Sequence, residues 1–138
     1  MRTEGWPEHL ADAIETAQKK AFSYGNFDCC LFAADVVLAI TGHDYAAELR
    51  SYQSKQSAYR IVARYGSLEA MISALLGKDP VHPAFAHRGD VVVGSVPVAD
   101  GEAGESVGIC CGVDCAFPAS AGLAFYPRTT VRLAWRIE

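Results

Sequence analysis

The chain has 138 residues, the length of one domain, and its 51% hydrophobic and 20% charged residues exclude a disordered chain. Its net charge is −4 and its 12 Lys and Arg residues are scattered, which argues against nucleic-acid binding, because phosphate recognition needs clustered basic residues. No apolar run reaches the roughly 18 residues of a membrane span, so we expect no membrane insertion.

The first half of the sequence has helical patterns. Residues 1–6 lack the apolar stretch of a secretory signal, which predicts synthesis in the cytoplasm without a signal peptide. Apolar residues at helical spacing predict a first helix from about Pro7 to Phe22. Asp28 can cap a second helix from Cys29 to about Thr41, which Gly42 would end. This second helix is apolar nearly all round, so we expect it at the centre of the fold.

Shorter helices are expected near Tyr45–Leu49, from about Ser54 to Tyr65 and from Ser67 to Leu76. After Asp79 the composition changes to short β-rich runs separated by Gly, Pro and Asp. These runs are Val91–Val93, Val107–Cys111, Cys115–Phe117, Leu123–Tyr126 and Val131–Ile137, with Gly101–Glu105 as a hairpin loop. The order predicts an α+β fold with an antiparallel sheet of about five strands. We expect a single domain over residues 1–138, with a helical part at about 7–77 and a sheet part at about 88–137.

A cysteine in the first turn of a buried helix is a candidate nucleophile. The free N–H groups and the helix dipole at that end favour the thiolate, and a central helix holds the sulfur rigidly. Cys29 fits this pattern, with Asp28 as the cap and orienting residue. In the alternative interpretation Cys29 is only a small buried hydrophobic residue and Asp28 only a cap.

Three motifs occur in a fixed order along the chain. They are Tyr24–Cys29 at a helix start, Arg88-Gly89-Asp90 before a strand, and Val107-Gly108-Ile109 on a later strand. This order resembles the NlpC-type cell-wall peptidases, a papain-like superfamily that cleaves peptidoglycan stem peptides. In that family an Asp-Cys pair starts the helix, Gly-Asp opens the first strand, and a His-Val-Gly-Ile strand supplies the base. The resemblance implies a papain-like domain with Cys29 in the nucleophile position.

A second resemblance covers nearly the whole chain through short pieces in a fixed order. The pieces are Phe27-Asp-Cys29, Phe32-Ala-Ala-Asp35, Thr41-Gly-His-Asp44, Tyr52, Arg88-Gly-Asp90, Gly108-Ile109, Ala116-Phe-Pro118, Gly122-Leu123 and Ala134-Trp-Arg136. They are similar to small proteins encoded among phage and prophage tail genes. This resemblance implies a protein made in the bacterial cytoplasm and incorporated into a phage tail. Its implied partners are other tail proteins, with peptidoglycan as a further candidate.

The chain departs from the peptidase pattern at the base. The position before Val107-Gly108-Ile109, which carries the catalytic His in the peptidases, is Ser106 here. A serine hydroxyl has no basic site suited to take a thiol proton, and losing a positioned acid–base costs roughly 10²–10⁴-fold in rate. Gly89 and Asp90 fall on the strand-opening pair, which we interpret as a structural turn.

Another histidine could replace the missing base. His87 is the best candidate for a substitute base, because it lies just before Gly89-Asp90 at a strand start. His82 lies in a Pro-rich connection that could fold over the site, whereas His43 follows the end of the second helix and His9 lies in the first helical turn. For each of them, an exposed or capping histidine is the commoner outcome, since a catalytic role follows geometry and not sequence position.

The cysteines offer one more alternative, a zinc or iron–sulfur site. They are Cys29, Cys30, Cys110, Cys111 and Cys115. The odd count and the two adjacent pairs do not form a disulfide framework, so we interpret all five as reduced thiols. Adjacent cysteines also fit metal ligation poorly, because Cys110 and Cys111 should point to opposite faces of one strand. We therefore expect no metal and no cofactor.

Three further side chains have a structural interpretation beside a functional one. Asp35 can pair with an arginine such as Arg88 or mark the solvent edge of the second helix. Asp90 is expected to hydrogen-bond a turn rather than orient a base. Trp135 is expected to anchor the last strand in the core, with a glycan platform as the less common alternative.

Two functions therefore compete. The first is a phage tail-associated protein, in the tail tip or in tail assembly, with a papain-like fold and lost or weak peptidase activity. The second is an active cysteine peptidase or amidase that cleaves peptidoglycan stem peptides with Cys29 as nucleophile. A host-directed protein that binds a cellular partner is a third interpretation. The missing base at Ser106 favours the first.

Overall fold

The structure is a computed structural model that describes residues 1–97 and 103–138. Its helices are α1 (Trp6–Ala17), α2 (Cys29–Thr41), α3 (Lys55–Tyr65) and α4 (Leu68–Leu76), with short 3₁₀ turns at Ala47–Leu49, Pro83–Phe85 and Arg128–Thr130. Its strands are β1 (Val91–Pro97), β2 (Ala103–Cys110), β3 (Asp114–Pro118), β4 (Leu123–Pro127) and β5 (Val131–Trp135).

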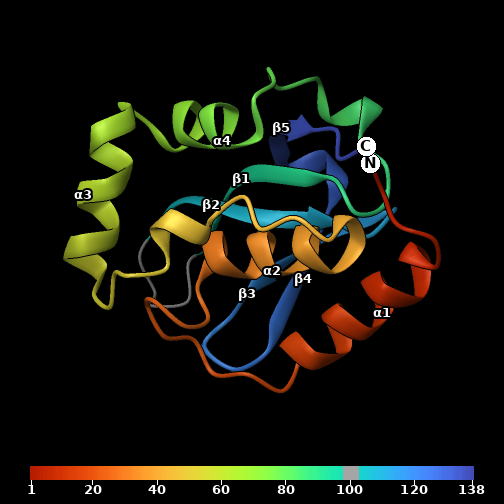
Figure 1. The fold of residues 1–138 in the computed structure, drawn as a ribbon, viewed down its shortest axis with the longest axis horizontal. Helices are drawn as coiled ribbons and strands as arrows, with labels where there is room; N and C mark the ends of the chain where they lie inside the picture. Colours follow the sequence, from red (N-terminus) through yellow and green to blue (C-terminus); the bar gives the residue numbers. More distant parts are fainter. Residues whose placement is uncertain (98–102) are drawn as a thin grey trace.

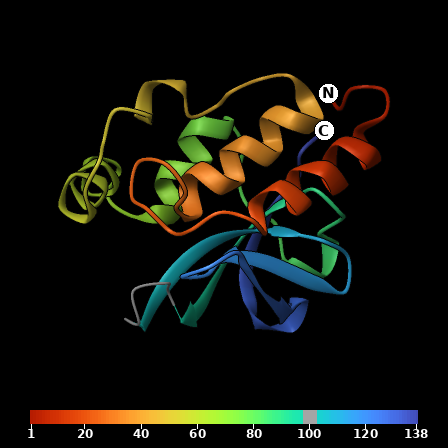
Figure 2. The same cartoon turned by 90° about the horizontal axis from the view of Figure 1, so that it is seen from below.

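The strands form one sheet with the order β4-β3-β2-β1-β5, in which every pairing is antiparallel. Figure 2 shows that α1, α2 and α4 lie on one side of this sheet, and Figure 1 shows α2 crossing its middle. Both views place α3 at the edge of the molecule, at the end where α2 begins. The α+β fold with a five-stranded antiparallel sheet is confirmed.

Helix α2 begins and ends where its sequence predicts. The side chain of Asp28 accepts a hydrogen bond from the N–H of Leu31 at 3.0 Å, which caps the first turn. Gly42 ends the helix in the left-handed conformation, with φ 77°, and its N–H bonds to the carbonyl of Leu38. Ser54 and Ser67 cap α3 and α4 in the same way.

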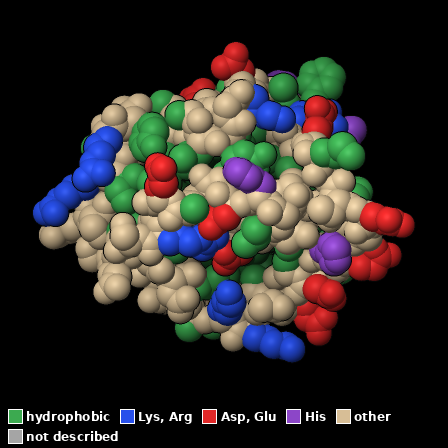
Figure 3. Space-filling model, in the orientation of Figure 1, with side chains coloured by type: hydrophobic (Ala, Val, Ile, Leu, Met, Phe, Trp, Pro, Cys, Tyr) green, Lys and Arg blue, Asp and Glu red, His purple; other side chains and the backbone are tan. Residues whose placement is uncertain are grey.

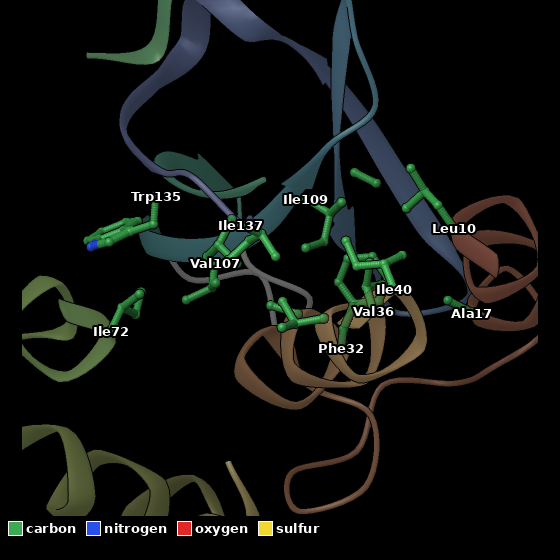
Figure 4. Packing of buried hydrophobic residues seen from close by; sticks show 14 of the residues in the cluster. Leu10, Ala17, Phe32, Val36, Ile40, Ile72, Val107, Ile109, Trp135 and Ile137 are labelled. Carbon is green, nitrogen blue, oxygen red and sulfur yellow. The ribbon is translucent and has the colours of Figure 1, made fainter. Parts of the chain in front are cut away.

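The main core lies between α2 and the sheet. Figure 4 shows Phe32, Val36 and Ile40 of α2 on the side of the helix that faces Ile109 of β2. Trp135 is fully buried in the same cluster, and its Nε1 donates to the hydroxyl of Ser73 at 3.0 Å. The core position of Trp135 is confirmed, and it ties β5 to α4.

The opposite face of the sheet carries a second buried cluster. Cys110 and Cys115 lie in it as directly opposed residues of β2 and β3. Cys111 instead packs against the main core. The expectation that Cys110 and Cys111 point to opposite faces is therefore confirmed, because side chains alternate across a strand.

Several boundaries differ from the expected ones. Helix α1 ends at Ala17 rather than Phe22, because the N–H of Phe22 bonds to the carbonyl of Ser120 and Ala21 bridges to Ala121 at the sheet. Near Tyr45–Leu49 only a 3₁₀ turn forms. Of the expected loop at Gly101–Glu105, residues 101 and 102 lie outside the described residues, and Gly104 and Glu105 belong to β2.

Asp90 joins both ends of the chain at the start of β1. It is fully buried, and its carboxylate lies 3.0 Å from an Nη of Arg2 and 2.9 Å from Nε of Arg136. It also accepts from the N–H of His87 at 2.8 Å and from that of Ile137 at 2.9 Å. The turn-binding role expected of Asp90 is confirmed by its bond to the N–H of His87. Figure 1 shows the two termini side by side.

Asp35 pairs with a different arginine from the one expected. Its carboxylate lies 2.8 Å from an Nη of Arg50, whose Nε also lies 2.8 Å from Asp44. Arg50 follows the turn at Ala47–Leu49, so this triad fastens that loop to α2. Arg88, the expected partner, instead stacks over the ring of Trp6, the first residue of α1.

Among the helices in the described residues, none combines the length and the apolar character needed to cross a bilayer.

Candidate functional site

The candidate site lies where the first turn of α2 meets the middle of β2. Cys29 is the first residue of α2, and it is partly exposed. Ser106 lies on β2 opposite Gly94 of β1. Its hydroxyl and the backbone N–H of Val107 are near enough to Cys29 to lower the pKa of its thiol. The structure thus brings together positions 29 and 106, which are 77 residues apart in the sequence.

Asp28 holds the chain segments around Cys29 in place. Its Oδ1 caps α2, while its Oδ2 accepts from the hydroxyl of Tyr52 at 2.6 Å and from the N–H of Gly25 at 3.0 Å. Burial, followed by the negative charge of Asp28, raises the pKa of Tyr52, so Tyr52 stays a hydrogen-bond donor. With these three bonds Asp28 acts as a cap and a positioning residue.

The environment of Cys29 favours its thiolate. The thiol of Cys30 donates to the sulfur of Cys29, and this is the largest effect that lowers the pKa of Cys29 below its usual 9.0. Burial opposes it, and the hydrogen bonds from Val107 and Ser106 lower the pKa further. The pKa of Cys30 is raised well above 9.0, first because it donates that bond and then because of burial.

A cavity of about 320 Å³ adjoins Cys29 and Ser106. It extends between α2, α3, α4 and β2, and most of its wall is apolar. A volume of this size is at the lower end of the roughly 300–1,000 Å³ range of small-molecule sites. Substrate groups could therefore reach the sulfur from this side.

His87 is not brought to Cys29. Its N–H bonds to Asp90, and its Nδ1 lies 3.1 Å from Arg136, at the start of β1. A Cβ built on neighbouring Gly89 would meet Ile40, near the C-terminal end of α2, whereas Cys29 is at the N-terminal end. Along a helix of 13 residues these ends are roughly 20 Å apart. His87 is therefore too distant to serve as the substitute base.

The other histidines also have structural positions. The Nδ1 of His82 accepts from the N–H of Ala84 and caps a 3₁₀ turn. The ring of His43 packs edge-on against Tyr45, with centroids 4.2 Å apart. His9 lies in α1 beside a shallow groove between α1 and α2. In the described residues, the hydrogen bonds that shift the pKa of Cys29 come from Cys30, Val107 and Ser106.

The described residues contain no group of three or more His, Cys, Asp and Glu side chains placed to hold a metal ion. Cys110 and Cys115 instead share a hydrogen bond across the strands, which lowers the pKa of Cys110 to about 6 and raises that of Cys115. This pair lies on the sheet face opposite α2.

The model of a protein family described as a domain of unknown function, DUF6950, matches residues 1–137. The chain belongs to the DUF6950 family. No curated protein matches it.

Sequence analysis did not identify two residues of this DUF6950 site, Tyr52 and Val107. Tyr52 lies 24 positions from its partner Asp28, in a loop whose path no local pattern predicts. Val107 acts through its backbone N–H, a group that every residue except proline carries. The interaction between the thiols of Cys29 and Cys30 is indicated by the sequence, because the two residues are adjacent.

The opposite pKa shifts of the two neighbouring cysteines predict selective alkylation of the DUF6950 domain. Because the thiolate is the nucleophile, iodoacetamide should modify Cys29 well before Cys30 at neutral pH. The rate at Cys29 should rise with pH and level off below pH 9, whereas that at Cys30 should still be rising there. Fragmentation mass spectrometry of samples quenched along a pH series measures both, with Cys30→Ser as the control. Equal rates at the two sulfurs would contradict the assignment.

Proposed function

We propose that this chain is a phage tail-associated protein with a papain-like, NlpC-type fold whose peptidase activity is lost or weak. The observation that carries the proposal is the pairing of Cys29 with Ser106: the nucleophile position keeps its cysteine, and a hydroxyl stands where the peptidases carry the imidazole. The resemblance to proteins encoded among tail genes supports the association with a tail.

The chemistry of the pair supports the loss of activity. Peptide hydrolysis by a cysteine needs an acid that protonates the leaving amine and a base that activates water afterwards. A serine hydroxyl does neither near neutral pH. His87, the substitute that the sequence offered, is held at the other end of α2 by Asp90 and Arg136.

The second candidate is an active cysteine peptidase or amidase that acts on peptidoglycan stem peptides. The lowered pKa of Cys29 and the N–H of Val107 at its sulfur favour this alternative, because they stabilise a nucleophilic thiolate without an imidazole. In this case the base would have to come from a partner chain, within the assembled tail.

Ser106→His tests the proposal by restoring the missing imidazole. If the site is papain-like, the imidazole should pair with Cys29 and move the alkylation profile of Cys29 to lower pH, toward the roughly 3.5–7.5 range of paired thiolates. Hydrolysis of a stem-peptide substrate should appear in Ser106→His and be absent from the natural chain. Ser106→Ala and Cys29→Ala are the matched controls.

The outcomes separate the candidates. Hydrolysis by the natural chain, lost in Cys29→Ala, would establish the active peptidase instead. An unchanged alkylation profile in Ser106→His, with the fold intact by circular dichroism, would contradict the papain-like site. Mass spectrometry of purified tails from the encoding phage or prophage tests the association, and absence of the chain from them would refute it.

A further inference from the structure

Two cysteines far from Cys29 in the fold face each other across neighbouring strands. Cys110 of β2 is the direct partner of Cys115 of β3, and both are fully buried in the cluster on the sheet face opposite α2. Both are free thiols, and each shifts the pKa of the other. The two sulfurs therefore share one small site.

The backbone bonds around this pair set the distance between the two residues. The N–H of Cys110 points away from Cys115 and donates to the carbonyl of Asp90 at 2.9 Å, whereas the N–H of the next residue, Cys111, donates to the carbonyl of Asp114 at 2.8 Å. Bonded and non-bonded pairs alternate along an antiparallel ladder, so Cys110 and Cys115 are a non-hydrogen-bonded pair. The Cα atoms of such pairs are about 4.5 Å apart, within the roughly 4.4–6.8 Å that a disulfide spans. The register thus allows a disulfide without movement of the strands.

The third cysteine of this hairpin is directed away from the pair. Cys111 packs against the main core, on the sheet face toward α2. Its Sγ lies 3.7 Å from the carbonyl oxygen of Ile109, whereas the Sγ of Cys110 lies 3.6 Å from that of Gly112. Burial raises the pKa of Cys111 to about 11, so it stays a protonated, unreactive thiol near neutral pH. Cys111 therefore serves as an internal reference for the pair.

Cys110 is the better nucleophile of the pair. The neighbouring thiol of Cys115 is the largest cause that lowers the pKa of Cys110 to about 6. The positive charge of Arg128 lowers it further, whereas burial and the negative charge of Asp90 oppose the shift. The pKa of Cys115 is raised, first by its contact with Cys110 and then by burial. An oxidant should therefore react first at Cys110, with Cys115 as the second thiol.

Short turn segments cover the pair, on the side of the sheet away from the helices. Figures 1 and 3 view the molecule from the helix side, which carries charged side chains of both signs. On the other side the cluster is completed by Tyr126 of β4 and by Ala86, which follows the 3₁₀ turn at Pro83–Phe85. An Nη of Arg128 donates to the carbonyl of Ala86 at 3.1 Å and so lies over this cluster. Because both cysteines are 0% exposed, a small uncharged oxidant should reach them far more readily than a bulky charged one.

We propose that Cys110 and Cys115 form a redox-active dithiol that hydrogen peroxide converts into a disulfide. The Cys110 thiolate attacks one peroxide oxygen, an S–O bond forms, the O–O bond breaks and hydroxide leaves, which gives a sulfenic acid. The sulfur of Cys115 then attacks that of Cys110, an S–S bond forms, the S–O bond breaks, and the oxygen leaves as water with the proton of Cys115. The dithiol loses two electrons, and the peroxide is reduced to two molecules of water. The sheet separates the pair from Cys29, so this reaction does not depend on the function proposed for Cys29.

The test treats the reduced full chain with hydrogen peroxide at neutral pH and follows its intact mass. We expect the loss of two hydrogen atoms, which dithiothreitol reverses. Fragmentation locates the bond, because backbone cleavage between Cys110 and Cys115 releases no separate fragments until the disulfide is reduced. Oxidised glutathione at the same concentration should form the bond at least about tenfold more slowly, since the pair is buried. A bond that includes Cys111, or no bond at all, would overturn the proposal, and a faster reaction with oxidised glutathione would refute the peroxide as its oxidant.

Cys115→Ala and Cys111→Ala are the matched variants. In Cys111→Ala the disulfide should form at the rate of the natural chain. In Cys115→Ala no disulfide should form, and the sulfenic acid should persist at Cys110, where dimedone traps it for fragmentation mass spectrometry. Circular dichroism checks the fold of both variants, and the bond mapped in Cys111→Ala decides the case if Cys115→Ala does not fold. A dimedone adduct absent from Cys110 in folded Cys115→Ala would contradict its role as the attacking thiolate.

Urea unfolding tests whether the native register fits the bond. A disulfide between Cys110 and Cys115 restricts the unfolded chain, so the oxidised protein should have a higher urea midpoint than the reduced protein. A disulfide that the hairpin accommodates only by distortion would store strain instead. A lower midpoint after oxidation would therefore show that the two cysteines are not positioned for the bond, and would overturn the proposal.

Discussion

Replacing Asp90 by Ala should cost about 3–5 kcal/mol of unfolding free energy, the typical cost of removing one partner from a buried ion pair. The carboxylate is fully buried and faces Arg2 and Arg136, and two backbone N–H groups donate to it. In the variant all of these donors lose their partner. Because the two arginines come from opposite ends of the chain, the loss also weakens the contact between the termini, where Arg2 keeps its bonds to the carbonyls of Ile137 and Arg88. Urea unfolding followed by tryptophan fluorescence measures the change.

Asp35→Ala is the matched control for this prediction. Asp35 pairs with Arg50 at 2.8 Å, but both side chains are about one-third exposed. Such a pair contributes roughly 0.2–1 kcal/mol. A loss below about 1 kcal/mol in Asp90→Ala, equal to that of Asp35→Ala, would show that the Asp90 cluster does not hold the termini together.

Most of the fold could be predicted because its signals are local. The cap at Asp28 and the glycine at 42 mark the ends of α2 within a few residues of sequence, and the structure has the same bounds. Where prediction failed, a distant partner decided the outcome. The end of α1 is set by a bond from Phe22 to Ser120, almost 100 residues away. Periodicity within α1 carries no information about that contact.

The candidate site could be predicted only in part, for the same reason. Cys29 is marked by its place at a helix start, and Ser106 was assigned through a resemblance rather than a local pattern. His87 cannot be the substitute base because Gly89, two residues after it, packs near the C-terminal end of α2, far from Cys29. Tertiary packing decides this, and no local sequence pattern shows it. The cavity arises from three helices that fail to close on one another, which no single segment of sequence specifies.

Gly25→Ala should be the most damaging small substitution near the site. Gly25 has φ 85°, and a Cβ built there would lie 2.0 Å from the carbonyl oxygen of Tyr52. The left-handed backbone costs an alanine roughly 1–2 kcal/mol, and the displaced Tyr52 segment adds roughly 1–3 kcal/mol as an overpacking cost. That movement pulls the Tyr52 hydroxyl away from Asp28, which loses one of the bonds that fix the start of α2.

Gly66→Ala separates the two parts of this cost. Gly66 has a similar φ of 97°, but a Cβ there meets nothing within 4 Å. Gly66→Ala should lose only the roughly 1–2 kcal/mol of unfolding free energy that the left-handed backbone costs an alanine. The pH profile of Cys29 alkylation should stay unchanged. In Gly25→Ala the urea midpoint should fall further and the alkylation profile should move, because the charge of Asp28 raises the pKa of Cys29 and its position is altered. Equal losses in the two variants, with identical profiles, would mean that the Tyr52–Asp28 contact does not support the site.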